Sequence, residues 1–133
     1  RPDMAFARAI AAAREGAPFA VLGDGRQTRD VTYVLDAVRA ALLAMEHAPP
    51  GGVYNVGGGA EIALLDALGE IERACGRPMS VEFSGAAAGD AGRTAADTAA
   101  ARRDLGWEPL TAFAEGIAAQ VASGALSPGR TAR

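Results

Sequence analysis

A chain of 133 residues, half of them apolar and with a formal net charge of only -3, has the composition of one soluble globular domain. This balance excludes a disordered chain and a nucleic-acid binder with a strong basic field. One cysteine, Cys75, and one histidine, His47, exclude a disulfide within the chain and the common zinc clusters. No apolar run approaches the roughly 20 residues that span a bilayer, so we expect a cytoplasmic protein with no membrane partner.

Predicted helices and strands alternate from the first residues. A helix over 4–15 ends at Gly16, and Pro18 reinforces the stop. The apolar run at 19–23 and the β-branched, aromatic run at 30–34 predict two short strands. Because the chain opens on arginine rather than methionine, a piece of a longer protein and a natural start are both open.

The middle of the chain continues this alternation. Asp36 is expected to cap the next helix, because its carboxylate can accept hydrogen bonds from the free N–H groups of the first turn. That helix runs up to His47 and has an apolar stripe: Val38, Leu42 and Met45. A third strand is predicted at 53–57, and a third helix from Leu64 to Gly76. The apolar stripe of the third helix comprises Leu64, Leu68, Ile71 and Cys75.

The last part of the chain adds a strand at 79–83, a flexible loop at 84–94 and a short helix capped by Asp97. Trp107 is expected to pin the last two helices together. The final helix has apolar residues four apart: Phe113, Ile117 and Val121. Strands that alternate with helices predict an α/β or α+β domain, and four short strands can depend on strands from elsewhere.

Arg29 is the side chain that points most directly to a ligand. It stands at the entry of a predicted strand, where a guanidinium has a defined direction and can grip a phosphate bidentately. The alternative is an arginine paired with Asp24, Asp30 or solvent. The preceding Gly23-Asp24-Gly25 is a weak match to a phosphate-binding loop, and a tight turn explains its glycines equally well.

Asn55 lies in the predicted strand that runs into Gly57, Gly58 and Gly59. A polar side chain inside an apolar strand needs a partner, which is either backbone or a ligand oxygen. No histidine lies near a serine or cysteine with an acidic partner, so the sequence predicts no catalytic nucleophile. The chain contains no lysine, so a catalytic Tyr-x-x-x-Lys is impossible in it.

Five motifs follow one another along the chain: GDGRQTRDVTYVLD, GGVYNVGGG, AGD with a downstream AD, RRDLGWEP and AEG. In this order they resemble the C-terminal part of the NAD-dependent epimerase/dehydratase family, the extended short-chain dehydrogenases that include UDP-glucose 4-epimerase. The resemblance implies a two-lobe enzyme whose N-terminal Rossmann domain holds NAD and the catalytic Tyr-x-x-x-Lys. It implies that residues 1–126 form the α/β substrate-binding C-terminal lobe and that the Rossmann half is missing. The residues SPGRTAR, at 127–133, are expected to form a disordered tail.

The resemblance also implies a function, partners and site residues. The chain would be the nucleotide-sugar-binding part of an NAD-dependent epimerase or dehydratase, with no catalytic, cofactor-binding or metal-binding residue and no activity as an isolated fragment. Its partners would be a nucleotide-diphosphate sugar and the missing Rossmann domain, with NAD and a homodimer in the intact protein. Arg29 matches the arginine that contacts the diphosphate, and Asp90 matches an acidic residue near the ribose. Asn55 matches a strand asparagine near the nucleotide sugar, and Val21 and Leu22 match a strand that faces the base.

Several positions depart from the family pattern: Leu22, Val31, Leu35, Ala63 and Ala87. Ala87 stands where the family has an arginine, and one lost charge-assisted phosphate contact costs about 1.5–3 kcal/mol. Arg93, a few residues on, is a candidate to replace it. These departures leave an alternative open: a non-catalytic binding or interaction module, or a truncated remnant that binds no nucleotide sugar.

Overall fold

The computed structural model describes residues 4–85 and 89–124, which form an α/β fold of helices and short strands. The helices are α1 (Ala5–Glu15), α2 (Val34–His47), α3 (Leu64–Cys75), α4 (Ala99–Leu105) and α5 (Phe113–Ala122). The strands are β1 (Phe19–Leu22), β2 (Thr28–Asp30), β3 (Glu61–Ala63), β4 (Val81–Ser84) and β5 (Arg93–Thr94). The predicted tail at 127–133 and the departure at Ala87 lie outside the described residues.

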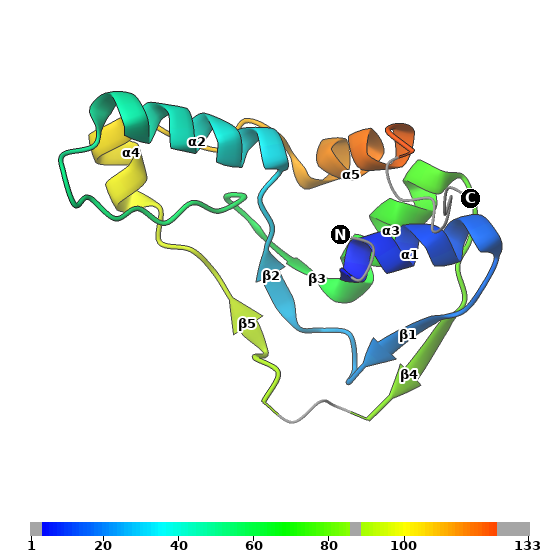
Figure 1. Ribbon diagram of the computed structural model, residues 1–133. Helices are drawn as coiled ribbons and strands as arrows, with labels where there is room; N and C mark the ends of the chain where they lie inside the picture. The colour runs from blue at the N-terminus through cyan, green and yellow to red at the C-terminus, as the bar shows by residue number, and fades with distance from the viewer. Residues whose placement is uncertain (1–3, 86–88, 125–133) are drawn as a thin grey trace, which may run out of the picture.

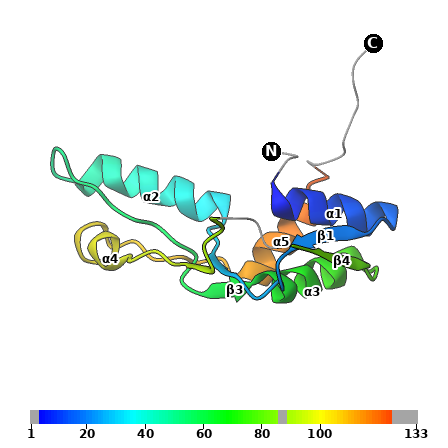
Figure 2. The ribbon, with the colours of Figure 1, turned by 90° about the horizontal axis from the view of Figure 1, so that it is seen from below.

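The elements gather in two regions, as Figure 1 shows. Helices α1, α3 and α5 lie with β1 and β4 at one end, and we call these five elements the body. Helices α2 and α4 lie at the other end, and we call them, with Trp107, the arm. Strands β2, β3 and β5 run between the two regions, and Figure 2 shows the same division from below.

The strands form two small sheets. In one sheet β1 pairs in parallel with β4. In the other, β2 lies at the centre, antiparallel to β3 and parallel to β5, with Arg29 opposite Ile62 and Thr94. Because successive side chains of a strand point to opposite faces, Arg29 points away from the face that carries Thr28 and Asp30.

The core of the body is built by helices α1, α3 and α5, with β1 beneath them. The predicted stripe of α3 supplies Leu68 and Ile71, and Ile117 from α5 is also buried. Helices α1 and α3 end at Gly16 and Gly76, whose φ angles of 69° and 66° are left-handed and suit glycine. The three helices predicted for this region are therefore confirmed.

Trp107 holds the arm together. Its ring is fully buried beside Ala40 of α2 and beside Ala101 and Leu105 of α4. Its Nε1–H donates a hydrogen bond of 3.0 Å to the backbone carbonyl of Asp36. The prediction that Trp107 joins the last two helices is wrong, because α4 packs on α2 and brings the ring there.

Asp36 does not cap α2, contrary to the prediction. The helix begins at Val34, so Asp36 lies inside its first turn. The carboxylate instead accepts hydrogen bonds from the backbone N–H of Leu110, at 3.2 Å, and of Thr111, at 3.0 Å. Asp36 is only 3% exposed, so this buried carboxylate ties the start of α2 to the segment that leads into α5.

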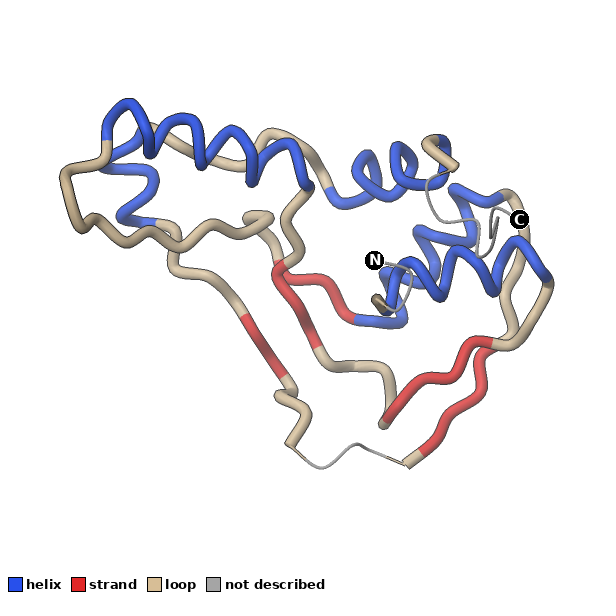
Figure 3. The backbone as a smooth tube through the Cα atoms, viewed as in Figure 1, coloured by secondary structure: helices blue, strands red, loops and turns tan. Residues whose placement is uncertain are grey.

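The strand predictions are partly confirmed. Two of them correspond to β1 and β4, with shifted ends. The strand predicted at 30–34 is misplaced: β2 lies at Thr28–Asp30 and shares only Asp30 with the prediction, because the chain enters α2 at Val34. The strand predicted at 53–57 is wrong: Figure 3 draws this stretch as loop, and none of the described strands pairs with it. The predicted loop at 84–94 contains β5, which the sequence did not predict and which forms as a partner of β2.

A bilayer-spanning helix would need to be both long and strongly apolar. Within residues 4–85 and 89–124, none of the helices meets these requirements.

Candidate functional site

The segment that leads into β2 begins with a tight glycine turn. Gly23 and Gly25 both have a φ of 74°, and the carboxylate of Asp24 accepts a hydrogen bond of 3.0 Å from the backbone N–H of Arg26. A Cβ added at Gly25 would collide with the side chain of Leu65 at the start of α3. The turn thus packs against the protein itself, which favours the tight-turn interpretation of this stretch over a phosphate-binding loop.

Arg29 projects from β2 and has two acceptors among the described residues. Its Nη2 donates to Oδ1 of Asp90 at 2.6 Å, and its Nη1 donates to the backbone carbonyl of Thr28 at 2.8 Å. The acidic partner is therefore Asp90, and not Asp24 or Asp30. The side chains of Arg29 and Asp90 are 33% and 42% exposed, so this ion pair stabilises the fold by only about 0–1 kcal/mol. A guanidinium has five N–H donors, which leaves others for a ligand.

Arg29 and Asp90 line a hollow of about 320 Å³ that is bounded by α1, β1, β2 and α3. Apolar and charged side chains share its wall: Arg8, Phe19, Leu22, Arg29, Ile62 and Asp90. Such a wall suits a ligand that combines an apolar or flat part with an anionic part, because each part meets a matching surface.

The hollow brings together three of the five residues predicted to bind substrate: Leu22, Arg29 and Asp90. Val21 directly precedes Leu22 on β1, and strand alternation turns its side chain into the core of the body. Val21 as a whole is 0% exposed and does not line the hollow, so it lies beneath the surface that a ligand would reach.

Asn55 lies apart from this hollow. It is an exposed loop residue that lines a second hollow of about 320 Å³ together with Asp30. The expectation that it needs a partner assumed a strand, and that strand is absent from the described residues. The glycines that follow serve the protein's own packing: the backbone N–H of Gly58 donates to the Asp30 carboxylate, and a Cβ at Gly58 would collide with the carbonyl of Val31.

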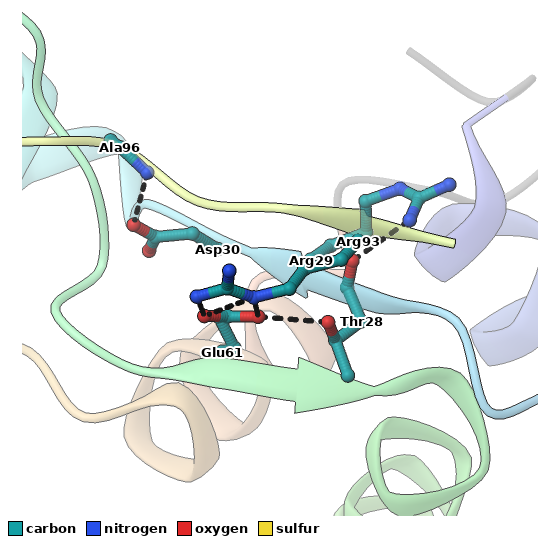
Figure 4. A network of polar contacts seen from close by, with 6 residues as sticks. All are labelled: Thr28, Arg29, Asp30, Glu61, Arg93 and Ala96. Carbon is teal, nitrogen blue, oxygen red and sulfur yellow. Dashed lines mark hydrogen bonds and ion pairs between the residues drawn. The ribbon is translucent and has the colours of Figure 1, made fainter. Parts of the chain in front are cut away.

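A second arginine, Arg93, lies on the other face of the sheet, as Figure 4 shows. Its Nε and Nη2 donate to both carboxylate oxygens of Glu61 at 2.6–3.0 Å, and the hydroxyl of Thr28 donates to the same carboxylate at 2.9 Å. The Arg93 hydrogen bonds, followed by that of Thr28, hold the pKa of Glu61 below its usual value. Arg93 thus joins β5 to β3 and does not line the hollow that contains Arg29.

Sequence reasoning missed two polar residues of the hollow, Arg8 and Gln27. The Cζ of Arg8 lies 6.0 Å from the centre of the Phe19 ring, and Nε2 of Gln27 donates to the carbonyl of Leu22 at 3.1 Å. In the sequence Arg8 is one arginine of an alanine-rich helix, and no spacing rule separates it from Arg14 on the same helix. The packing of α1 over β1 is what brings Arg8 to the hollow.

Comparison with known proteins identifies the family of this chain. Residues 1–57 match the sequence model of the NAD dependent epimerase/dehydratase family. An uncharacterized UDP-glucose epimerase of Bacillus subtilis is 36% identical over 124 residues, which cover 92% of this chain and 39% of that protein. A dTDP-glucose 4,6-dehydratase of Xanthomonas campestris is 33% identical over 130 residues, which cover 90% of this chain and 37% of that protein. The chain belongs to the NAD-dependent epimerase/dehydratase family.

The structural match agrees with this assignment. The crystal structure of UDP-glucuronic acid 4-epimerase from Bacillus cereus, in complex with UDP-glucuronic acid and NAD, has a TM-score of 0.86 and 34% sequence identity to this chain. The match covers 92% of this chain and 40% of that one. The chain therefore spans about two fifths of the length of the family members it matches. The predicted family and the predicted α/β fold of an extended short-chain dehydrogenase are both confirmed.

The glycine stretches at 23–25 and 57–58 of this family member do not suit the pyrophosphate of NAD. A dinucleotide pyrophosphate needs a glycine-rich turn with open backbone N–H groups at a helix N-terminus. Here the space beside Gly25 is filled by Leu65, and the space beside Gly57 and Gly58 is filled by Asp30 and Val31. Neither of these two glycine stretches is therefore open to a dinucleotide pyrophosphate.

Proposed function

We propose that this chain is the nucleotide-sugar-binding part of an NAD-dependent sugar-nucleotide epimerase or dehydratase. The observation that carries the proposal is the Arg29 guanidinium, which lines an otherwise largely apolar hollow together with Leu22 and Asp90. Relatives add support, since the Bacillus cereus epimerase was solved with UDP-glucuronic acid and NAD, and an epimerase of Thermotoga maritima was solved with UDP-glucose.

Each residue of the hollow has a role that follows from its chemistry. Arg29 offers charged N–H donors to the diphosphate, which accepts such bonds in a bidentate manner. Leu22 offers an exposed apolar surface against which a flat base can pack. Asp90 is a carboxylate that can accept hydrogen bonds from ribose hydroxyls, once it shares or releases Arg29. Asn55, in its separate hollow, is a weaker member of the proposed set. Val21 is fully buried, so its part is limited to holding Leu22 at the hollow.

The chemical step belongs to other parts of the intact enzyme under this proposal. NAD would supply reversible hydride transfer at the sugar there, and a Tyr-x-x-x-Lys pair would handle the proton. The present chain has no lysine, and its glycine stretches at 23–25 and 57–58 are filled by its own side chains and backbone, so we expect residues 1–126 to bind substrate without converting it. A cytoplasmic location and a homodimer of the intact enzyme are further parts of the proposal.

Calorimetric titration of the chain with UDP, UDP-glucose and NAD tests the proposal. We expect UDP and UDP-glucose to bind and NAD to give no heat. Arg29→Ala should weaken UDP binding by about 10- to 100-fold, the value of one charge-assisted hydrogen-bond site. Arg26→Ala is the matched control, because Arg26 is exposed on the neighbouring turn and does not line the hollow.

The same titration distinguishes the proposed function from the main alternative, a binding or interaction module that does not bind nucleotide sugars. The short ion pair between Arg29 and Asp90 favours that alternative, because it occupies the guanidinium without any ligand. Absence of UDP binding by the unmodified chain would support the alternative. Equal UDP affinity of the Arg29→Ala and Arg26→Ala variants would show that Arg29 does not bind the diphosphate. Binding of NAD by this chain would contradict the proposal that NAD binds to another part of the intact enzyme.

A further inference from the structure

We propose that Arg8 supplies a second guanidinium for the diphosphate in this hollow. The proposal rests on the proposed function and adds a residue that determines charge and specificity at the same site. Nothing in the motif order along the sequence points to Arg8, since it lies on the first helix, well before the glycine turn and Arg29.

The position of Arg8 makes it accessible from within the hollow. Arg8 lies in the second turn of α1 and is exposed, and it lines the hollow together with Arg29 of β2. Its guanidinium stands 6.0 Å from the centre of the Phe19 ring, so an aromatic face of β1 supports it from one side. No described carboxylate forms an ion pair with Arg8, whereas Arg29 shares its charge with Asp90.

The charge of the hollow depends on Arg8. Its charged lining residues are Arg8, Arg29 and Asp90, which together carry a net charge of +1. Without Arg8 the charges of Arg29 and Asp90 cancel, and the hollow would have no net attraction for an anion. A diphosphate carries more negative charge than one partly neutralised arginine can balance, so a second cation in the same hollow is needed for tight binding.

Arg93 is not available for this role. The family pattern has a second phosphate-binding arginine where this sequence has Ala87, and Arg93 is the nearest arginine downstream. Arg93 instead makes three hydrogen bonds with Glu61 on the face of β2 that is opposite to Arg29. Arg8 is therefore the arginine that the fold offers to the hollow in addition to Arg29.

The test is a titration series in which the number of phosphates changes. The 133-residue chain and its Arg8→Gln, Arg8→Lys and Arg26→Gln variants are titrated with UDP, UMP and uridine at two salt concentrations. We expect Arg8→Gln to weaken UDP binding by about tenfold, UMP binding by less, and uridine binding not at all. Arg8→Lys should restore part of the loss, and Arg26→Gln, which removes the same charge outside the hollow, should change UDP affinity by less than about twofold.

The outcomes separate the two proposals. If the unmodified chain binds no UDP, both the proposed function and the role of Arg8 fail. If it binds UDP and Arg8→Gln behaves like Arg26→Gln, the role of Arg8 fails alone. If Arg8→Gln weakens uridine as much as UDP, Arg8 acts on the nucleoside or on the shape of the hollow, and the diphosphate role is overturned. Circular dichroism of each variant checks that α1 is intact.

Discussion

In the body the apolar stripe of α3 is buried, whereas in the arm the stripe of α2 lies open to solvent. Leu68 on α3 is 3% exposed, and Met45 on α2 is 83% exposed. Both stripes have the same helical period in the sequence, and both predict a helix correctly. The period therefore determines which side of a helix is apolar, but burial depends on a facing element. The described chain supplies α1 and α5 to cover α3, and it covers α2 only on the side that meets α4.

The two regions also differ in what holds them together. The body has a distributed core to which three helices and β1 contribute. The arm has four buried apolar residues, and one of them, Trp107, is much larger than the rest. A small core that relies on one ring should unfold locally after a single substitution of that ring. A distributed core should instead lose stability in proportion to the size of the group removed.

Trp107→Ala should have the largest effect on stability. Removal of the buried ring leaves a cavity between α2 and α4 and a carbonyl of Asp36 without its donor, which should lower the free energy of unfolding by about 3–5 kcal/mol. Hydrogen exchange measured by mass spectrometry should show lost protection in α2 and α4, while α1 and α3 stay protected. The matched variant in the body is Ile71→Ala, which should lower the free energy of unfolding by about 2–5 kcal/mol. In this variant the amides of α1 and α3 should lose protection from exchange first. Identical exchange patterns in the two variants would mean that arm and body unfold as one unit.

Asp36→Asn should have the next largest effect, and the effect should depend on pH. Burial alone would raise the pKa of Asp36, but hydrogen bonds from Leu110 and Thr111 and the charge of Arg39 outweigh it and hold the pKa below its usual value. A lowered pKa contributes stability that is present above the unfolded value of about 3.9 and is lost as pH falls through the folded value. The Asp36→Asn substitution should therefore lower the free energy of unfolding by about 1–3 kcal/mol at pH 7.

Urea unfolding at several pH values measures this effect. The difference between the unmodified chain and Asp36→Asn should be constant from pH 7 to about 5. It should begin to shrink at about pH 4, where the unfolded carboxylate takes up protons, and should be lost as pH falls through the lowered pKa of the native carboxylate. Asp104→Asn is a control, because Asp104 pairs with Arg103 on the exposed surface of α4. A difference that does not change with pH would show that the charge of Asp36 is not what stabilises the junction.

Helices were predictable from the sequence and short strands were not, for a physical reason. A helix of three turns repeats its apolar residues several times and ends at glycines such as Gly16 and Gly76. Strands β3 and β5 have three and two residues, too few for a period to be visible, and they exist through pairing with β2. The stretch at 53–57 shows the reverse case, because a strand-like composition without a partner strand remains a loop.

The candidate site was predictable only in part. Local sequence singled out Arg29 as a directed guanidinium but left open that it pairs with an aspartate or solvent, and the family resemblance was what assigned it to the diphosphate. Leu22 and Asp90 were selected through the family resemblance, and the fold brings both to the hollow of Arg29. Arg8 was missed because its proximity depends on how α1 packs over β1, which no local pattern encodes. Asn55 was grouped with them on a strand that does not form, so its separate position follows from the same error.

Met45→Gln should have the smallest effect, and it tests the open stripe of the arm directly. Glutamine has nearly the helix propensity of methionine, and the side chain is almost wholly exposed, so the free energy of unfolding should change by less than about 0.5 kcal/mol. The same change in the body, Leu68→Gln, removes a buried apolar side chain and buries an amide, and should lower the free energy of unfolding by about 2–5 kcal/mol. Urea unfolding of the two variants measures the contrast. A loss above about 1 kcal/mol for Met45→Gln would mean that another surface covers the exposed face of α2 in solution. The apolar stripes of α2 and α3 would then both be buried, and they would differ only in the element that covers them.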